Sequence, residues 1–277
     1  MQTTIAHDHQ YRFGPLLKRW RSARKMSQLD LAINAGVSQR HVSFLESGRA
    51  QPSKPMVMQL SEALEVPLRE RNSLLQAAGF APYYRRRGFD EDGMAPVREA
   101  LTRTLQHHDP YPGVVIDRDY NVLMKNAAFD RMTALFGDPE ALWQRVCPNG
   151  TPNLLRLTFH PQGARPFIRN FDEVGAYMLQ RAWRESQQYD GETRAFIEEL
   201  RQDPSLPDNW HDPDPSAAMP PVLSLVLGQG EIEMRLFTMI SVFGTPHDIT
   251  TDEIRIETFF PGDAATEQLF SQLQQHN

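Results

Sequence analysis

The stretch Ser27–Arg49, SQLDLAINAGVSQRHVSFLESGR, limits what this chain can fold into more than any other part of the sequence. It begins with a serine followed three residues later by Asp30, a pair typical of a helix start because both side chains accept hydrogen bonds from the first free amides. Gly36 is suited to end this helix, because a left-handed backbone costs glycine little. Ser38 is suited to begin a second helix. The stretch therefore predicts two short helices joined by a tight turn.

The second of these helices has an apolar face and a polar face. Val42 and Leu45 lie three residues apart and are expected to face inward. The residues left on the outer faces are Gln39, Arg40, His41, Ser43 and Phe44. Gln and Arg in the first turn of a second helix can form bidentate hydrogen bonds with base edges in a DNA major groove. We therefore interpret the stretch as a DNA-binding helix-turn-helix; the alternative is an ordinary helical hairpin with a polar face.

Further helices are expected on both sides of this stretch. One covers about 13–25, one begins near Pro55, and one covers 68–78, so that five short helices close a domain. In the loop GRAQPSKP between two of them, Arg49 and Lys54 are placed to meet phosphates. We expect these side chains to position the helices on DNA rather than to read its sequence.

The pattern SQLDLAINAGVS and the ending LESGR resemble the XRE, or phage-repressor, class of helix-turn-helix proteins. The resemblance implies an all-α, five-helix, lambda-repressor-like DNA-binding domain. It also implies that Gln28 touches a phosphate and that Arg21 pairs with Glu46. The residues that it places at the groove, with the helix-capping Ser38 beside them, are Gln39, Arg40, Ser43 and Phe44. An aromatic residue replaces the usual polar base reader at Phe44, where the ring contacts a thymine methyl or packs beside the DNA backbone.

Charge divides the chain in two. Residues 1–90 carry 14 Lys and Arg against 7 Asp and Glu, a formal charge of +7, and the remainder carries 15 against 28, a formal charge of −13. A basic first part attracts phosphates, whereas the acidic second part is not expected to touch DNA. The expected organisation is a flexible tail at 1–12, the helix-turn-helix domain at 13–80, a linker at 81–93 and a second domain at 94–277.

Two short segments outside the domains leave alternatives open. In the tail, His7, Asp8 and His9 either bind a metal ion or have no role. In the linker, the arginine triplet 85–87 either follows the DNA backbone as an arm or belongs to a solvated hinge.

The second half mixes helical and strand patterns. The runs GVVID and YNVLMK read as two strands joined at Arg118-Asp119, and NAAFDRMTALFG reads as a helix ending at Gly137, an order typical of the opening of a PAS-like module. Helical patterns follow at 142–159, 172–188 and 191–203. The chain then returns to strand patterns around Gly228–Gly230 and in IRIETFFPGD, and it closes with a helix at 264–275. We expect an α+β domain with an antiparallel sheet backed by helices.

This half resembles the ligand-binding domain of the MmyB-like transcription regulators. The resemblance rests on PVREAL, PYPGVVIDRDYNVLMKNAAFDRM, NLLRLTFHPQGARPFIRN and FGTPHDIT…IETFFPGDAAT. It implies a PAS-like pocket that can hold a fatty acid or a similar apolar molecule. A long loop at about 204–221 resembles an insertion and leaves the pocket entrance undefined.

The candidate ligand residues lie on segments that also carry large apolar side chains. A fatty acid needs an apolar tube and one or two polar groups at its mouth. The polar candidates are Asn126, Asn153, Arg156 and His160, with Arg156 preferred as the carboxylate partner. The apolar candidates are Phe129, Phe159, Tyr177 and Phe237.

Other functions find little support in the sequence. It has no Gly-rich phosphate loop, nucleophile elbow or HExxH motif, so we do not expect an enzyme. The histidines match no metal-site spacing, and no cofactor is expected beyond a bound lipid. The single cysteine, Cys147, excludes an internal disulfide and is a buried bystander or, as the alternative, a redox sensor. With no apolar run near the length of about 20 residues that spans a bilayer, and no secretory signal pattern, we expect a cytoplasmic protein that does not engage membranes.

The leading hypothesis is a transcription regulator that binds a palindromic DNA operator as a homodimer and responds to a small apolar effector. The alternative is that the second domain is a ligand-free dimerisation or protein-interaction module. An enzyme domain fused to a DNA-binding domain is a distant third reading. A solid core would favour the second hypothesis, and an elongated cavity would favour the first.

Overall fold

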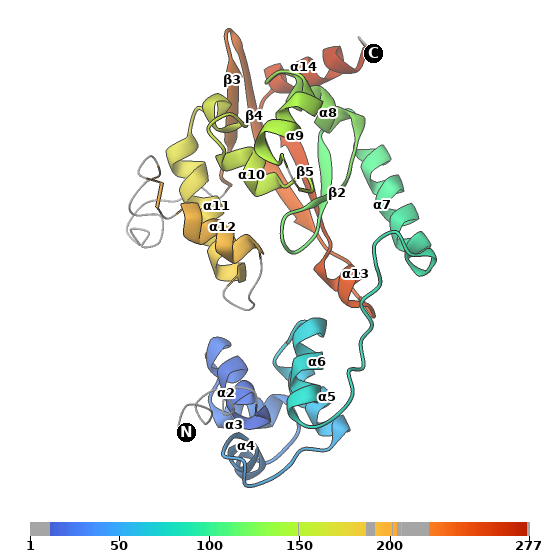
Figure 1. Ribbon diagram of the computed structural model, residues 1–277, viewed down its shortest axis with the longest axis vertical. Helices are drawn as coiled ribbons and strands as arrows, with labels where there is room; N and C mark the ends of the chain where they lie inside the picture. The colour runs from blue at the N-terminus through green and yellow to red at the C-terminus, as the bar shows by residue number, and fades with distance from the viewer. Residues whose placement is uncertain are drawn as a thin grey trace. The chain divides into compact units, whose positions relative to one another are not determined.

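The computed structural model describes residues 12–148, 150–186, 192–200, 202–203, 206 and 222–275. These residues divide into two compact units. The first contains the chain up to Gly88 and the segment Gly244–Asp252, and the second contains the rest (Figure 1). Residues 1–11 of the expected tail, with His7, Asp8 and His9, lie outside the described residues, and so does nearly all of the expected loop at 204–221.

The first unit is a bundle of short helices, as the sequence predicts. Its helices are α2 (Phe13–Ala23), α3 (Gln28–Asn34), α4 (Gln39–Glu46), α5 (Lys54–Ala63) and α6 (Leu68–Ala77). The predicted capping box at the start of α3 is formed, since Ser27 and Asp30 each accept a hydrogen bond from the other's amide. Gly36 has a φ of 61°, the left-handed conformation that the turn before α4 requires. Leu17, from α2, is completely buried in the core.

The segment Gly244–Asp252, which we call the clasp, packs with the helical unit although it lies far along the chain. Its Asp248 is buried and accepts a hydrogen bond from Nη1 of Arg87 at 2.9 Å. Its Asp252 accepts one from the amide of Leu68, also at 2.9 Å. Leu68 is the first residue of α6, which has no side-chain cap of its own, so the clasp supplies that helix with an acceptor.

The clasp corrects both readings of the arginine triplet for Arg87, while for Arg85 and Arg86 the two readings stay predictions. Arg87 is half-buried and ion-paired with Asp248, so it is neither a free arm nor part of a solvated hinge. The backbone beside it is held as well, because the amide of Ile249 donates to the carbonyl of Arg85 at 2.9 Å. The side chains of Arg85 and Arg86 remain exposed. Contacts with the clasp therefore hold part of the segment 81–93, which its composition indicates to be a linker.

The second unit is built on a five-stranded antiparallel sheet, which confirms the predicted α+β class. Its strands are β1 (Gly113–Ile116), β2 (Val122–Lys125), β3 (Leu225–Gln229), β4 (Ile232–Ser241) and β5 (Arg255–Pro261). Their order in the sheet is β2-β1-β5-β4-β3. The last strand, β5, therefore lies beside β1. The long connection from β4 to β5 contains the clasp and the short helix α13 (Ile249–Glu253).

Helices cover the sheet of this unit (Figure 1). They are α7 (Ala95–His108), α8 (Ala127–Ala134), α9 (Pro139–Val146), α10 (Leu154–Phe159), α11 (Phe171–Ser186), α12 (Glu192–Leu200) and α14 (Ala264–Gln275), with 3-10 turns η1 (Asp92–Met94) and η2 (Arg165–Phe167). The single helical region expected at 142–159 is two helices, α9 and α10. Pro148 and Pro152 explain the break, because proline lacks the amide hydrogen that a continuing helix needs.

The two faces of the sheet pack against different helices. Val114 and Ile116 of β1 belong to the larger core, with α8 to α12 and α14, whereas Val115 packs with α7. The same alternation on β5 puts Phe259 in the larger core and Ile256 with α7. The face toward the larger core is the one that contains the cavity described below.

Candidate functional site

The predicted groove-facing residues lie together on α4. Ser38 caps the helix by accepting a hydrogen bond from the amide of His41 at 3.2 Å. Gln39 and Arg40, in the first turn, are exposed, and Ser43 is half-exposed one turn later. The arrangement gives two long polar side chains with bidentate capacity at the start of a rigid, capped helix.

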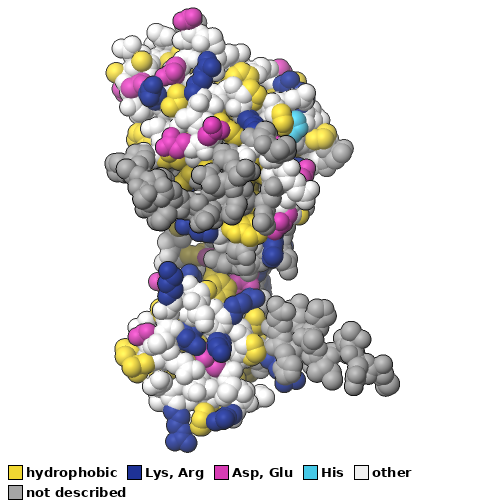
Figure 2. Space-filling view, turned by 90° about the vertical axis from the view of Figure 1, so that its left-hand side faces the viewer, with side chains coloured by type: hydrophobic (Ala, Val, Ile, Leu, Met, Phe, Trp, Pro, Cys, Tyr) yellow, Lys and Arg dark blue, Asp and Glu magenta, His cyan; other side chains and the backbone are white. Residues whose placement is uncertain are grey.

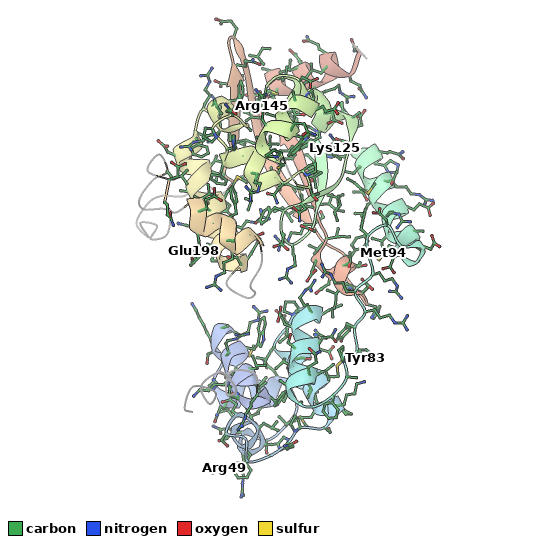
Figure 3. The ribbon with its side chains drawn as sticks, in the orientation of Figure 1. Arg49, Tyr83, Met94, Lys125, Arg145 and Glu198 are labelled. Atoms are coloured by element: carbon green, nitrogen blue, oxygen red, sulfur yellow. The ribbon has the colours of Figure 1, made fainter. Side chains whose placement is uncertain are left out.

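Phe44 lies between two arginines. The guanidinium carbon of Arg40 is 5.1 Å from the centre of the ring, and that of Arg49 is 5.9 Å from it. Both distances are within the range of cation–π attraction. The ring therefore supports one cation on α4 and one in the loop just after it, a role that neither sequence reading of Phe44 includes. Arg49 itself points away from the body of the unit (Figure 3).

An internal ion pair ties α2 to α4. Nε and Nη2 of Arg21 donate to the two carboxylate oxygens of Glu46 at 2.6 and 3.0 Å, and Nη1 donates to the carbonyl of Met26 at 2.7 Å. The side chains of Arg21 and Glu46 are 12% and 4% exposed. The side-chain amide of Gln28 donates to the same carboxylate at 2.8 Å. The structure thus brings together the pair implied by the resemblance, and it ties the side chain of Gln28 to that pair; a phosphate contact by Gln28 stays a prediction.

The remaining cation of the predicted DNA surface is Lys54. It is exposed at the first residue of α5, and its ammonium nitrogen lies 4.9 Å from the centre of the Tyr83 ring. Figure 2 shows Lys and Arg side chains gathered on the visible face of the helical unit, at the bottom of the view. The positive field that the sequence places on this part of the chain is therefore displayed at its surface.

The second unit contains a cavity of about 120 Å³ with a mainly apolar wall. Phe129, Met132 and Phe136 line it from α8 and the residues just after it, and Leu154 lines it from α10. Phe259 lines it from the sheet. A wall of this kind excludes water and favours an apolar occupant.

One part of the cavity wall is charged. Arg181 of α11 and Glu257 of β5 line the cavity with the hydroxyl-bearing side chains of Tyr120 and Thr238. Behind them lies Glu185, which accepts hydrogen bonds from Arg181 Nε at 3.1 Å, from the Tyr120 hydroxyl at 2.7 Å and from Arg255 Nη1 at 2.5 Å. Two elements, α11 and β5, thus bring two arginines and two glutamates to one place.

These charges shift one another's protonation. Burial raises the pKa of Glu257, against the pull of Arg181 and Arg255. Burial alone would also raise the pKa of Glu185, but Arg255, the Tyr120 hydroxyl and Arg181 outweigh it and lower that pKa. Burial and the charge of Glu185 raise the pKa of Tyr120. The cluster therefore holds Glu185 ionised, keeps the Tyr120 hydroxyl protonated and favours the neutral form of Glu257.

Comparison with protein families accounts for both units. The profile described as "MmyB-like transcription regulator ligand binding domain" matches residues 97–273. The chain belongs to this family. A second profile, described as "Helix-turn-helix", matches residues 17–71. This MmyB-like protein is therefore a DNA-binding transcription regulator with a ligand-binding domain, and the families it matches are those of regulators rather than enzymes.

Two other comparisons add little. Among solved structures, the chain is similar to one titled "Structure of an RNA-binding Light-Oxygen-Voltage Receptor", at 13% sequence identity and a TM-score of 0.25. The similarity covers 98% of this chain and 66% of the other. A comparison with the curated proteins found no match.

Of the ligand residues predicted for this MmyB-like domain, Phe129 and Tyr177 line the cavity. Phe159 is completely buried in the core outside the cavity wall. The expectation for Phe237 is corrected, because its ring stacks on Phe260 on the face of the sheet opposite Phe259. Adjacent residues of a strand point to opposite faces, and β4 is registered so that Phe237 faces away.

The four polar candidates lie elsewhere. Asn126 caps α8 and bonds the backbone around it, and His160 accepts a hydrogen bond from the amide of Gln162. Asn153 and Arg156 line a second, more polar depression of about 510 Å³. There the guanidinium carbon of Arg156 lies 4.4 Å from the centre of the Phe196 ring. None of the four lines the apolar cavity, so any contact of theirs with an apolar ligand stays a prediction.

The charged residues that line the cavity are Arg181 and Glu257, which were not predicted. A signal for Glu257 exists in IRIETFF, where one carboxylate interrupts a strand of otherwise buried type. Its partner Arg181 lies in an amphipathic helix, where a single arginine is ordinary, so only the fold identifies it.

Three other features bear on earlier expectations. Cys147 is buried, and burial raises the pKa of its thiol, which favours the unreactive protonated form. Within the described ranges, no group of three or more His, Cys, Asp or Glu residues is placed to hold a metal ion. The same ranges contain no helix that is both long and apolar enough to cross a membrane.

Proposed function

We propose that this regulator binds a palindromic operator as a homodimer, reads its sequence through α4, and responds to a small apolar molecule such as a fatty acid. The observation that carries the proposal is the cavity: an apolar wall with one charged end, inside a chain that also carries a helix-turn-helix. Exposed Gln39 and Arg40 at the start of a capped helix support sequence reading. A symmetric dimer would present two such helices to a palindrome.

The size of the cavity limits the ligand. Its volume of about 120 Å³ is below the roughly 300–1,000 Å³ of many ligand sites. Met132 and Met178 line it, and methionine side chains adapt their shape at low cost. We therefore expect a ligand of medium length to fit first and a long acyl chain to bind only after these side chains move.

The clasp connects the cavity wall to the helical unit through the polypeptide chain, and this connection could carry regulation. The clasp joins β4 to β5, and these strands carry Thr238, Glu257 and Phe259 of the cavity wall. At its other side, Asp252 accepts the hydrogen bond from the first amide of α6. We propose that a ligand which shifts these strands alters the hold of the clasp on the helical unit. A ligand can do this only if it binds one state more tightly, and a nearly complete switch needs about 5 kcal/mol of preference.

The DNA hypothesis is tested by the double variant Gln39→Ala with Arg40→Ala. Operators would first be selected from random duplexes by the unaltered protein. We expect the variant to lose about 1–3 kcal/mol of discrimination per base contact while retaining weak, salt-dependent binding. Unchanged discrimination between operator and random duplex would exclude α4 as the reading helix.

The alternative, a ligand-free dimerisation module, has its own observation. The side chains of Met239 and Val242, on and just after β4, are 54% and 62% exposed, and apolar surface of this kind can bind a second copy. Native mass spectrometry with octanoic acid separates the two functions. A dimer that binds the acid supports sensing, whereas a dimer that binds neither this acid nor longer ones supports the module.

A further inference from the structure

We propose that Arg85 and Arg86 bind phosphates of the DNA duplex that α4 reads, so that the DNA surface of this regulator extends beyond its helix-turn-helix. Both side chains belong to residues 83–86, which we call the basic segment. This inference rests on the proposed function, since it assumes that a duplex is bound at α4. It adds a second contact, independent of the DNA sequence, from the chain after α6.

A buried side chain of α6 fixes the start of the basic segment. The side-chain oxygen of Asn72 accepts hydrogen bonds from the amides of Tyr83 and Tyr84 at 2.8 and 3.0 Å. Its side-chain nitrogen donates to the carbonyl of Tyr84 at 2.8 Å. Because Asn72 is only 9% exposed, water competes little for these bonds. Three hydrogen bonds thus hold the start of the segment against the helix.

The clasp fixes the other end of the basic segment. The amide of Ile249 donates to the carbonyl of Arg85 at 2.9 Å. Two residues later, Nη1 of Arg87 donates to Asp248, also at 2.9 Å. Arg85 and Arg86 therefore extend from a backbone that is held on both sides. A held backbone loses less conformational entropy on binding than a free one, so less of the binding energy is spent on ordering it.

Two of the three neighbouring arginines have no acceptor in the described fold. Arg87 is neutralised by its ion pair with Asp248. The side chains of Arg85 and Arg86 are exposed, and neither forms a hydrogen bond or an ion pair with a residue that the structure describes. A guanidinium is always charged and can bond two phosphate oxygens at once. Both side chains are therefore available to an anionic partner.

Tyr83 places the basic segment beside a predicted phosphate contact. The centre of its ring lies 4.9 Å from the ammonium nitrogen of Lys54, the first residue of α5. Arg85 comes two residues after Tyr83, about 7 Å along an extended chain, and phosphates recur about every 3.4 Å along the axis of each DNA strand. The two exposed arginines are therefore spaced to meet phosphates near the one that Lys54 is expected to bind.

The geometry of the segment favours the DNA backbone over the base edges. α4 already supplies the side chains for the major groove, which admits one helix. Arg85 and Arg86 lie outside the helices, on extended backbone. Contacts with phosphates fix the register and orientation of a protein on a duplex but do not read its sequence directly. Loss of these contacts should therefore change the affinity and its salt dependence, and leave the sequence preference as it is.

The experiment measures operator binding by the full chain in fluorescence anisotropy, from about 50 to 200 mM KCl. Each phosphate contact contributes about 0.9 to the magnitude of the slope of log affinity against log salt. Arg85→Ala with Arg86→Ala should therefore lower that magnitude by about 1.8, and lower the affinity at the lowest salt about tenfold or more. Discrimination between the operator and a random duplex should stay unchanged. A slope equal to that of the unaltered protein would overturn the inference.

The matched control is the double variant Arg103→Ala with Arg235→Ala. Both side chains are exposed on the second unit, at 68% and 53%, and their loss removes the same charge from the chain. The salt slope of this variant should equal that of the unaltered protein. An equal loss of slope in the control would show that net charge, rather than contact by the basic segment, sets the salt dependence, and the inference would fail.

Arg85→Lys with Arg86→Lys guards against misfolding, because it keeps both charges on the same backbone. Lysine also binds phosphates, as a point charge without the guanidinium's parallel donors. This variant should retain most of the salt slope that the alanine variant loses. A lysine variant that loses as much slope as the alanine variant would contradict a phosphate contact by these two side chains.

The outcomes separate this inference from DNA reading by α4. Gln39→Ala with Arg40→Ala should lose discrimination and keep salt-dependent binding, which is the reverse of the pattern expected for the basic segment. If the unaltered protein discriminates between duplexes and the alanine variant of the basic segment keeps the full slope, only this inference fails. If the unaltered protein prefers no selected duplex over random DNA, reading by α4 fails, and this inference fails with it.

Discussion

The two units of this chain each contain a partly buried arginine paired with glutamate, and the pairs differ in one respect. In the helical unit, all three nitrogen positions of Arg21 donate to protein oxygens. In the ligand-binding unit, Arg181 uses only its Nε among the described residues and turns toward a cavity. A saturated arginine ties elements together, whereas an unsaturated one beside a cavity is available to a ligand. The same residue type thus joins two helices in one unit and lines a cavity in the other.

The cores of the two units also differ in how completely they are filled. In the helical unit, three core leucines have no exposed surface: Leu17, Leu31 and Leu60. The helices around them hold α4 rigidly in place. The larger core of the second unit leaves about 120 Å³ unfilled. Unfilled volume loses dispersion energy, because the atoms that line it lack neighbours. A cavity that persists beside charged side chains is therefore consistent with a ligand that completes the packing.

The largest effect is expected from breaking the saturated pair. Glu46→Ala leaves Arg21 and Gln28 without their shared acceptor in a site that is largely closed to water. We expect the free energy of unfolding of the helical unit to fall by about 3 kcal/mol. Urea denaturation followed by circular dichroism measures it. The control is Glu62→Ala, an exposed carboxylate on α5, and similar losses in both variants would show that the pair adds no stability.

The second largest effect is expected from replacing a buried alanine by leucine in each of the two cores. Ala32→Leu overfills the helical unit, where Ala32 is 2% exposed, and should cost about 1–3 kcal/mol of unfolding free energy. Ala164→Leu grows into the cavity and should cost less, while reducing octanoate affinity at least about tenfold. Denaturation and calorimetry give both quantities. Tight octanoate binding by Ala164→Leu would show that the ligand lies elsewhere.

A smaller effect is expected at the clasp. Asp252→Ala removes the acceptor for the first amide of α6 and should cost about 1 kcal/mol, the usual worth of a helix cap. Hydrogen exchange of the α6 amides, read by mass spectrometry, should accelerate in the variant. Asp252→Asn keeps an acceptor oxygen and should retain most of the protection. If the α6 amides exchange equally fast in Asp252→Ala and in the unaltered protein, the clasp does not regulate the helical unit as proposed.

The smallest effect concerns Phe44. Phe44→Leu keeps an apolar side chain but removes the ring that attracts Arg40 and Arg49, a loss of about 0.5–1 kcal/mol at an exposed site. Operator affinity should fall about two- to fivefold in fluorescence anisotropy. Phe44→Tyr retains the ring and should retain the affinity. If Phe44→Leu binds the operator as tightly as the unaltered protein, the ring contributes packing and no attraction to the two arginines.

The helical unit could be predicted closely because its signals are local. The capping box at Ser27, the glycine at Gly36 and the cap at Ser38 each act within one turn of the chain. The family resemblance added the Arg21–Glu46 pair, which spans 25 residues and which spacing alone does not reveal.

The ligand-binding unit was predictable in its elements but not in its site. Strand and helix patterns gave the α+β class, yet the cavity depends on register: β4 pairs Thr238 with Phe259, which turns Phe237 to the other face. Arg181 and Glu257 lie 76 residues apart in the sequence and meet only through the fold. The clasp was missed for the same reason, because a loop between two strands carries no local sign of the helix that it caps.

The most direct measurement of the central claim is the affinity of the full chain for its selected operator with and without saturating octanoic acid. Because the account joins DNA reading and ligand sensing in one chain, it predicts a change in Kd of about fivefold or more, the usual scale of allosteric coupling. An operator affinity that stays the same at every concentration of a bound acid would contradict the account, since the two units would then act independently.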